Sequence, residues 1–239
     1  MSFSVEKIVV DGQAVIGHLI FPENVREKNP AVLFIHGWGS NQTKNIERAK
    51  ELAQAGHICL TIDLRGHGES EGDFKTLSRA DHLVDVLAAY DFLASQRGVD
   101  SENIAVVGAS YGGYLAILLS SERPIRQLVL RVPANYKDEG FDEPTYEARK
   151  VFDIREYRET EMTHEGNRAL YAASLFRGNV YIIESEKDEI IPHQTIINYK
   201  NAFKKAVSRK YSLMQGTFHG LTGENLKKYD QLLLSYLFA

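Results

Sequence analysis

The sequence predicts an α/β protein in which a mostly parallel sheet carries helices on both faces. Short runs rich in Val, Ile and Leu alternate with longer segments of helical spacing, and this alternation is typical of parallel sheets. Continuous apolar runs of this length favour strands that are buried on both faces. The predicted strands lie at residues 31–35, 57–62, 104–107, 127–130, 180–183 and 211–214, and the predicted helices at 43–55, 78–96, 111–121, 193–206 and 224–237.

An antiparallel hairpin is expected ahead of the first buried strand. Residues 4–10 and 14–21 alternate apolar and polar side chains, and Asp11-Gly12 separates the two runs. An Asp-Gly pair accepts the positive backbone angles of a tight two-residue turn. The two runs should therefore pair with each other.

The alternation of strands and helices stops between residues 133 and 168. This stretch is charged, contains Pro133 and Pro144, and has no strand pattern. A long segment of this kind between two core strands favours an inserted cap or lid over a disordered linker, and the alternative is a solvated surface excursion. We expect one domain over residues 1–239, with the cap at about 133–170.

The composition is that of an ordinary globular protein and excludes a disordered or fibrous chain. In 239 residues, 28 Lys and Arg against 32 Asp and Glu give 28 − 32 = −4. This mildly acidic balance, without a basic patch in the sequence, gives no electrostatic reason to expect nucleic acid or an anionic membrane surface as a partner. We expect a small substrate that is neutral or weakly charged, and the oligomeric state stays open.

Two features favour a cytoplasmic location. Cys59 is the single cysteine and has no partner for an internal disulfide, which fits a reducing compartment. Residues 1–10 lack the basic start and the apolar stretch of a signal peptide, and the chain has no run of about 18 apolar residues. We therefore expect a soluble cytoplasmic protein.

A candidate nucleophile lies at Ser110. The stretch Gly108-Ala109-Ser110-Tyr111-Gly112 follows a predicted strand and begins a predicted helix. A serine at such a turn adopts a strained backbone conformation, and glycines on either side let neighbouring backbone come close. The turn presents the hydroxyl at the carboxyl edge of the sheet. It also places Ser110 at the positive end of a helix, where an oxyanion is stabilised.

The order of residues along the chain supplies an acid and a base for this serine. In this architecture the acid follows a later strand and the histidine follows the last one. His219 is the one histidine after the final predicted strand, and it is the candidate general base. Among the carboxylates after the strand at 180–183, Asp188 is the candidate acid because it comes just before the next predicted helix. Glu186 and Glu189 are the alternatives.

Backbone N–H groups that hold the oxyanion are expected from two loops. The Tyr111 N–H directly follows the nucleophile, and the loop after the first buried strand has the sequence His36-Gly37-Trp38-Gly39. The two glycines free this loop to turn its amides toward the nucleophile, so the Trp38 N–H is the second candidate donor. The Trp38 ring either lines the substrate pocket or serves packing alone. His36 and residues 63–70 are assigned to the scaffold.

Aromatic side chains of the expected cap are candidates for substrate binding. They suggest a wall that stacks on a ring in the substrate, and the alternative is that they anchor the cap to the body of the protein. The candidates are Trp38, Tyr136, Phe141, Tyr146, Phe152 and Tyr157.

These motifs are together identified as those of the α/β-hydrolase superfamily. The matching residues are 36–39, 63–70, 108–113, Asp188 with Ile191-Pro192, and His219. The resemblance implies an eight-stranded, mostly parallel sheet with the cap over a serine triad. Within the superfamily the chain is most similar to small carboxylesterases of the feruloyl and cinnamoyl type, and the nucleophile stretch also resembles that of prolyl-oligopeptidase-like peptidases. Ser185 departs from many relatives, which have Gly or His ahead of the acid.

The sequence thus predicts an enzyme. We expect a serine hydrolase that cleaves carboxylic esters of small acyl groups, aromatic ones included, through an acyl-Ser110 intermediate. Peptidase, amidase or thioesterase chemistry on the same triad is one alternative, and a ligand-binding protein without turnover is another. The sequence has no phosphate-binding loop, no H-E-x-x-H pair and no cluster of Cys and His, so no cofactor and no metal are expected.

Overall fold

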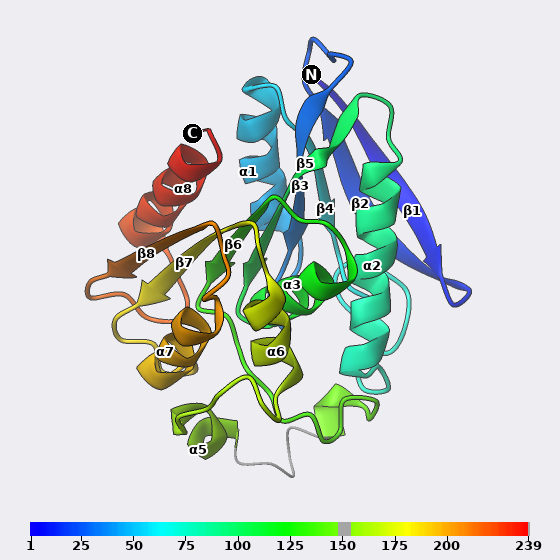
Figure 1. The fold of residues 1–239 in the computed structure, drawn as a ribbon. Coiled ribbons are helices and arrows are strands. Elements are labelled where there is room, and N and C mark those ends of the chain that lie inside the picture. Colours follow the sequence, from blue (N-terminus) through cyan, green and yellow to red (C-terminus); the bar gives the residue numbers. More distant parts are fainter. Residues whose placement is uncertain (148–153, 239) are drawn as a thin grey trace.

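The computed structural model describes residues 1–147 and 154–238 and has an eight-stranded sheet at its centre (Figure 1). The strands are β1 (Ser2–Val10), β2 (Gln13–Phe21), β3 (Asn29–Ile35), β4 (Ile58–Ile62), β5 (Val99–Ala109), β6 (Gln127–Arg131), β7 (Asn179–Ser185) and β8 (Ser208–Met214). Their order across the sheet is β1-β2-β4-β3-β5-β6-β7-β8. β2 is antiparallel to β1 and β4, and the other neighbours are parallel. The mostly parallel sheet is confirmed.

The hairpin at the start of the chain is confirmed as well. Asp11 and Gly12 connect β1 to β2 with φ angles of 50° and 77°, the left-handed values that a tight two-residue turn requires. β1 and β2 stay in register along their whole length, from the pair Val10 and Gln13 to the pair Ser2 and Phe21.

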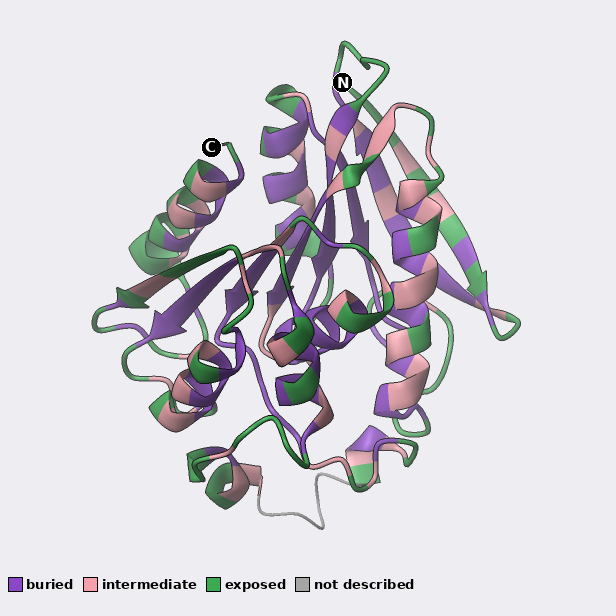
Figure 2. Cartoon of the chain, in the orientation of Figure 1, coloured by how far each residue is buried: buried purple, intermediate pink, exposed green. Residues whose placement is uncertain are grey.

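Helices cover both faces of the sheet. They are α1 (Thr43–Gln54), α2 (Arg79–Ala94), α3 (Tyr111–Glu122), α5 (Ile154–Glu159), α6 (Arg168–Leu175), α7 (His193–Ala202) and α8 (Gly223–Leu237). α1 and α8 share one buried apolar cluster with the sheet, and α2, α3, α6 and α7 share the other. On β3, Leu33 belongs to one cluster and its neighbour Phe34 to the other. The central strands β3, β4, β6 and β7 are buried on both faces (Figure 2), which explains their continuous apolar sequences.

The segment expected to form a cap connects β6 to β7. Near its start, Tyr136 and Phe141 are buried in the apolar cluster that contains α2 and α3. Its last residues begin α6, whose Ala169 and Leu170 are fully buried in the same cluster. Both ends of the segment therefore pack into the body of the protein.

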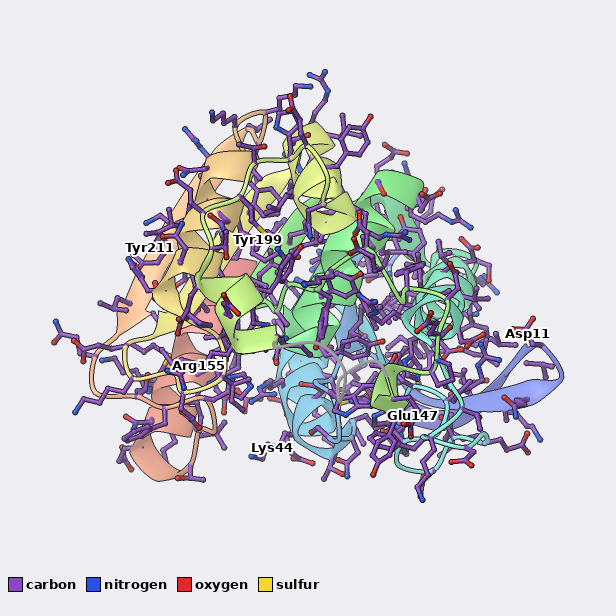
Figure 3. All side chains as sticks on the ribbon, turned by 90° about the horizontal axis from the view of Figure 1, so that it is seen from below. Asp11, Lys44, Glu147, Arg155, Tyr199 and Tyr211 are labelled. Atoms are coloured by element: carbon purple, nitrogen blue, oxygen red, sulfur yellow. The ribbon has the colours of Figure 1, made fainter. Side chains whose placement is uncertain are left out.

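Most of the chemistry-bearing loops lie at one edge of the sheet. The parallel strands β3, β5, β6, β7 and β8 run in one direction, so their carboxyl ends share an edge, which Figure 3 views directly. Trp38, Ser110, Asp188 and His219 all follow strands that end there. Among the helices that the structure describes, none combines the length and the apolar character needed to cross a membrane.

Candidate active site

Ser110 occupies the sharp turn between β5 and α3. Its φ and ψ are 52° and −114°, a strained conformation for a residue with a side chain. The turn is held at both sides, because the Ser110 N–H donates to the Arg131 carbonyl at 2.9 Å and the Ser110 carbonyl accepts from the Ala134 N–H at 3.0 Å. A Cβ on Gly108 would lie 2.3 Å from the Gly112 carbonyl oxygen. Glycine is therefore required where the strand passes the helix, as the motif predicts.

His219 and Asp188 are in direct contact. The His219 Nδ1 lies 2.9 Å from each carboxylate oxygen of Asp188, whose side chain is only 2% exposed. Asp188 Oδ1 also accepts from the backbone N–H groups of Ile190 and Ile191, at 2.9 and 2.7 Å. These bonds fix the carboxylate, and they fix the imidazole with Nδ1 as donor. The His219 Nε2 then carries the lone pair that can accept a proton.

The other two candidate acids have different partners. Glu186 accepts from the Gly216 N–H at 2.7 Å, and Glu189 accepts from the backbone N–H of His219 at 3.0 Å. In the described part of the chain, neither carboxylate hydrogen-bonds the imidazole. Of the three carboxylates, the structure therefore pairs Asp188 with the His219 side chain.

Ser110 and His219 line the same cavity, which has a volume of about 250 Å³. Within the described residues no direct hydrogen bond joins the Ser110 hydroxyl to the imidazole. In enzymes without substrate this bond is often long, and it shortens when the reacting complex forms. The cavity brings together the nucleophile and base candidates that lie far apart in the sequence.

The loop after β3 packs directly on the nucleophile. A Cβ on Gly37 would lie 3.4 Å from the Ala109 carbonyl oxygen and 3.6 Å from the Ser110 Cβ, so the backbones are close. Gly39 has a φ of 69°, which allows the loop to turn. Trp38 lines the cavity, and its ring also packs against Phe74 with centroids 4.5 Å apart. The ring therefore serves packing, and a role of Trp38 in binding a substrate stays a prediction.

His36 holds this loop in place and stays neutral. Its Nε2 accepts from the Leu64 N–H at 3.0 Å, and its Nδ1 donates to the Gly37 carbonyl at 2.8 Å. Burial lowers the pKa of the imidazole to about 4. The assignment of His36 to the hydrogen bonding of the loop is supported by these contacts.

Residues 63–70 form the scaffold behind the same loop. The buried Asp63 carboxylate accepts from the backbone and side-chain N–H groups of Gln42, at 2.8 and 3.0 Å, and from the Glu69 N–H at 3.0 Å. A Cβ on Gly68 would overlap this carboxylate, at 2.1 Å from Oδ2. The segment therefore joins β4 to the start of α1, beside the cavity.

Of the aromatic side chains of the expected cap that the structure describes, none lines this cavity. Tyr136 and Phe141 are buried, with the Arg79 guanidinium over both rings at 5.4 and 5.8 Å. The Tyr157 hydroxyl accepts from the Asn167 side chain at 2.8 Å. The Tyr136 ring packs against that of Tyr114 on α3, with centroids 4.9 Å apart, and the Tyr157 hydroxyl donates to the Tyr136 carbonyl at 3.3 Å. These contacts anchor the segment to the body of the protein. The expectation of a stacking wall needs correction for these side chains.

Two further candidates complete this group. The centroid of the Tyr146 ring lies 6.0 Å from that of the Phe74 ring, and Phe74 in turn packs against Trp38. Phe152 lies outside the described residues. Among the aromatic candidates in the described part of the chain, Trp38 alone lines the cavity.

Several residues that line the cavity were missed at the level of sequence. They are Lys44, Asn45 and Arg48 of α1, Arg131 of β6, and Tyr229 of α8. Arg131 ends an otherwise apolar strand, and a charge in that position is the one sequence signal that could have found it. Its Nη2 donates to the backbone carbonyls of Phe218 and His219, so it also braces the loop that carries the imidazole.

Comparison with known proteins places these features in a family. The family model described as serine aminopeptidase, S33, matches residues 26–156, a range that includes Trp38 and Ser110. An uncharacterized protein of Mycobacterium tuberculosis is 34% identical over 118 residues, which are 49% of this chain and 41% of that protein. Palmitoyl-protein thioesterase ABHD10 of Homo sapiens is 31% identical over 110 residues, which are 45% of this chain and 34% of that protein. The chain thus spans 41% or less of the length of these relatives.

The fold has close counterparts among solved structures. Est1E from Butyrivibrio proteoclasticus, with ferulic acid bound, has a TM-score of 0.75 and 19% sequence identity, and the match covers 97% of both chains. At 19% sequence identity, the structural similarity is evidence for the fold alone. It confirms the α/β-hydrolase fold that the resemblance implies. The family model matches more than half of the residues of this chain. The chain, which has the α/β-hydrolase fold, therefore belongs to the family described as serine aminopeptidase, S33.

Proposed function

We propose that the protein is a serine hydrolase that cleaves carboxylic esters of small acyl groups through an acyl-Ser110 intermediate. The observation that carries the proposal is the pair of 2.9 Å contacts between His219 and Asp188, on a cavity that Ser110 also lines. A strained serine, a fixed imidazole and a buried carboxylate are the parts that nucleophilic acyl transfer needs.

The proposed reaction has two halves. His219 Nε2 removes the Ser110 proton while the serine oxygen forms a bond to the ester carbonyl carbon, and the carbonyl electron pair moves onto its oxygen. The N–H groups of Tyr111 and Trp38 hold this oxyanion. When the carbonyl re-forms, the bond to the alcohol oxygen breaks, and the imidazolium returns the proton to the leaving alkoxide. Water repeats the sequence on the acyl-serine and releases a carboxylic acid and free Ser110.

Asp188 has a supporting electrostatic role in this scheme. Its carboxylate holds the Nδ1–H tautomer of His219 and stabilises the imidazolium that forms in each half. Its two backbone N–H donors, from Ile190 and Ile191, keep it oriented while the proton moves between Ser110 and His219.

The size and lining of the cavity support a small acyl group. A volume of about 250 Å³ leaves room for a short chain or a single ring, and the Trp38 ring offers an aromatic surface. The similar structure Est1E has ferulic acid bound. We therefore include aromatic acyl groups in the proposal.

Two other reaction classes on the same residues have specific support. The family model is described as a serine aminopeptidase, and one curated relative is a palmitoyl-protein thioesterase. Amide and thioester cleavage would use the same nucleophile, base and oxyanion donors, and differ in the leaving group. A ligand-binding protein without turnover is the remaining alternative.

A substrate panel tests the proposal. The purified protein is assayed on 4-nitrophenyl esters of graded acyl length, on an aryl-acyl ester, on aminoacyl anilides and on acyl thioesters. Ester cleavage should exceed amide and thioester cleavage, and Ser110→Ala should reduce it by about a millionfold. Ser120→Ala is the matched control, because the Ser120 hydroxyl only bonds the Ile117 carbonyl within α3.

Labelling with a fluorophosphonate probe separates the remaining outcomes. Wild type and Ser120→Ala should be labelled, and Ser110→Ala should not. Ester cleavage that persists undiminished in Ser110→Ala would refute the proposal. An unlabelled wild type that binds esters without cleaving them would favour the binding protein instead.

A further inference from the structure

One wall of the candidate active-site cavity is basic. This wall, which we call the basic wall, consists of Lys44 and Arg48 on α1 and Arg131 at the end of β6. Among the described residues that line the cavity, none is an aspartate or a glutamate. We propose that the basic wall binds an anionic group of the substrate, a carboxylate or a phosphate, so that the ester cleaved at Ser110 is an anion. This inference rests on the proposed function.

Arg131 is a buried cation that forms no ion pair with a carboxylate of the described residues, although the charges of Asp188 and Glu189 act on it from nearby. The residue is 7% exposed, and burial lowers the pKa of its guanidinium, although an arginine stays protonated in a protein. Its Nη2 donates to Ser185 Oγ and to the carbonyls of Phe218 and His219, and no described group accepts from its Nε. A buried charge without an opposite charge is costly. An anion in the adjacent cavity would offset that cost.

Lys44 adds to the positive potential of the cavity. The Lys44 ammonium has no ion pair or hydrogen bond with another described residue, and Figure 3 shows it at the carboxyl edge of the sheet. The first turn of α1 contains no acidic residue, and the carboxylate nearest the start of this helix, Asp63, is buried and accepts from the Gln42 N–H at 2.8 Å. Asn41 and Asn45 of the same turn region also line the cavity.

The nearby carboxylates lie behind this surface. Asp230 pairs with Arg48, with 2.6 Å between Nε and Oδ1. Asp188 and Glu189 accept hydrogen bonds from the side chain and the backbone of His219. These acids balance part of the positive charge from the protein side, but a substrate in the cavity would meet Lys44, Arg48 and Arg131 first.

The basic wall changes an expectation drawn from composition. A net charge of −4 suggests a neutral or weakly charged substrate, but net charge describes the sum over the whole surface. A site is governed by the few charges within about 10 Å, roughly the Debye length. Here those charges come from elements that are distant in the sequence.

A pair of matched esters tests the inference. The two substrates are the 4-nitrophenyl monoester of glutaric acid and 4-nitrophenyl pentanoate, which have the same chain length and differ in a terminal carboxylate. The measured quantity is the ratio of kcat/KM for the anionic ester to that for the neutral ester. This ratio should fall about twofold to fivefold in Lys44→Gln, the range for a partly exposed ion pair, and further in Lys44→Glu. Added salt should lower the ratio for wild type.

Lys50→Gln is the matched control. Lys50 lies on the same helix, pairs with Glu47 at 2.9 Å and does not line the cavity, so its replacement should leave the ratio unchanged. The same ratio in wild type, Lys44→Gln and Lys44→Glu, with the neutral ester still cleaved, would overturn the inference and leave the proposed function standing. Cleavage of neither ester together with an unlabelled Ser110 would remove the proposed function and the inference with it.

Competition assays identify the anion. Glutarate and inorganic phosphate are tested as inhibitors of pentanoate-ester cleavage, with sodium chloride at equal ionic strength as the reference. Stronger inhibition by glutarate assigns the wall to a carboxylate, and stronger inhibition by phosphate assigns it to a phosphate. Either inhibition should weaken in Lys44→Glu. Inhibition no greater than that by sodium chloride contradicts the inference.

Discussion

The Tyr111 hydroxyl donates a hydrogen bond to the buried imidazole of His82, with 2.9 Å between the oxygen and Nδ1. The other ring nitrogen of His82 donates to the Arg65 carbonyl at 3.1 Å. Burial lowers the pKa of His82 to about 3, so the ring is neutral and Nδ1 is an acceptor. Because Tyr111 directly follows Ser110, this bond ties the start of α3 to α2 and to the loop after β4.

Removal of this hydroxyl should destabilise the protein. Tyr111→Phe leaves the His82 Nδ1 buried without a donor, and the loss of a buried partner costs about 1–3 kcal/mol. The free energy of unfolding, measured in urea, checks this. Tyr114→Phe is a closely matched control, because Tyr114 is also fully buried on α3 but its hydroxyl has no hydrogen-bond partner in the described part of the chain. Equal losses in the two variants would show that the hydrogen bond contributes nothing.

Two buried histidines should make stability depend on pH. The pKa is about 3 for His82 and about 4 for His36, against 6.5 without burial. Between pH 4 and 6.5 the unfolded chain takes up protons at these positions and the folded protein does not. The free energy of unfolding therefore falls as the pH falls through this window, by ~1.4 kcal/mol per pH unit for each histidine. Burial raises the pKa of Asp85 to about 6, so this group opposes the trend below that pH.

Urea unfolding across this pH window checks the prediction. His82→Gln removes one titrating group and should flatten the dependence by ~1.4 kcal/mol per pH unit, whatever its effect on absolute stability. His164→Gln is the control, because His164 is exposed and its replacement should leave the dependence as it is. A dependence that His82→Gln does not change would mean that the folded protein protonates His82.

The contact between Asp188 and His219 was predictable, and other parts of the site were not, for a physical reason. Chain order at the carboxyl ends of parallel strands forces the loops after β5, β7 and β8 together, whatever the intervening sequence. No comparable rule fixes the direction in which a side chain of the segment points. Tyr136 and Phe141 are aromatic residues in the expected segment, but packing against α2 and α3 turns them into the core.

The charge in the cavity was predictable only in part, because the place of Arg131 at the end of a strand is a signal in the sequence and the place of Lys44 is not. Lys44 and Arg131 belong to separate elements, α1 and β6, that line the same cavity, and composition averages their charges with those of distant acids. Helix ends show the same limit, since the helix predicted at 193–206 ends at Ala202. Local propensity defines where a helix can form, and tertiary contacts decide where it stops.

The identity of the acid can be tested by three isosteric substitutions. Asp188→Asn keeps the size of the side chain but removes the charge that holds the Nδ1–H tautomer of His219, and kcat should fall by about ten-thousandfold. Glu186→Gln and Glu189→Gln change loop carboxylates that bond backbone N–H groups, so kcat should change far less. A larger loss in Glu189→Gln than in Asp188→Asn would contradict the pairing seen here.

Arg131 should position His219 as well as face the cavity. Its Nη2 bonds to the carbonyls of Phe218 and His219 fix the loop that carries the base, and a misplacement of about 1 Å costs on the order of a hundredfold in rate. Arg131→Met should therefore lower kcat for the neutral pentanoate ester by about tenfold to a hundredfold, with a smaller change in KM. Arg131→Lys restores a charge without the planar fork and should recover only part of this loss.

The control variant for Arg131→Met is Arg126→Met, at the residue just before the start of the same strand. Arg126 is exposed and precedes β6 at the edge opposite the cavity, so Arg126→Met should leave kcat unchanged. Because the pentanoate ester carries no charge, its kcat reports on the position of His219 and not on anion binding. A variant Arg131→Met that lowers only the rate on the anionic ester would show that the side chain acts on the substrate alone, and that the carbonyl bonds to the His219 loop are dispensable.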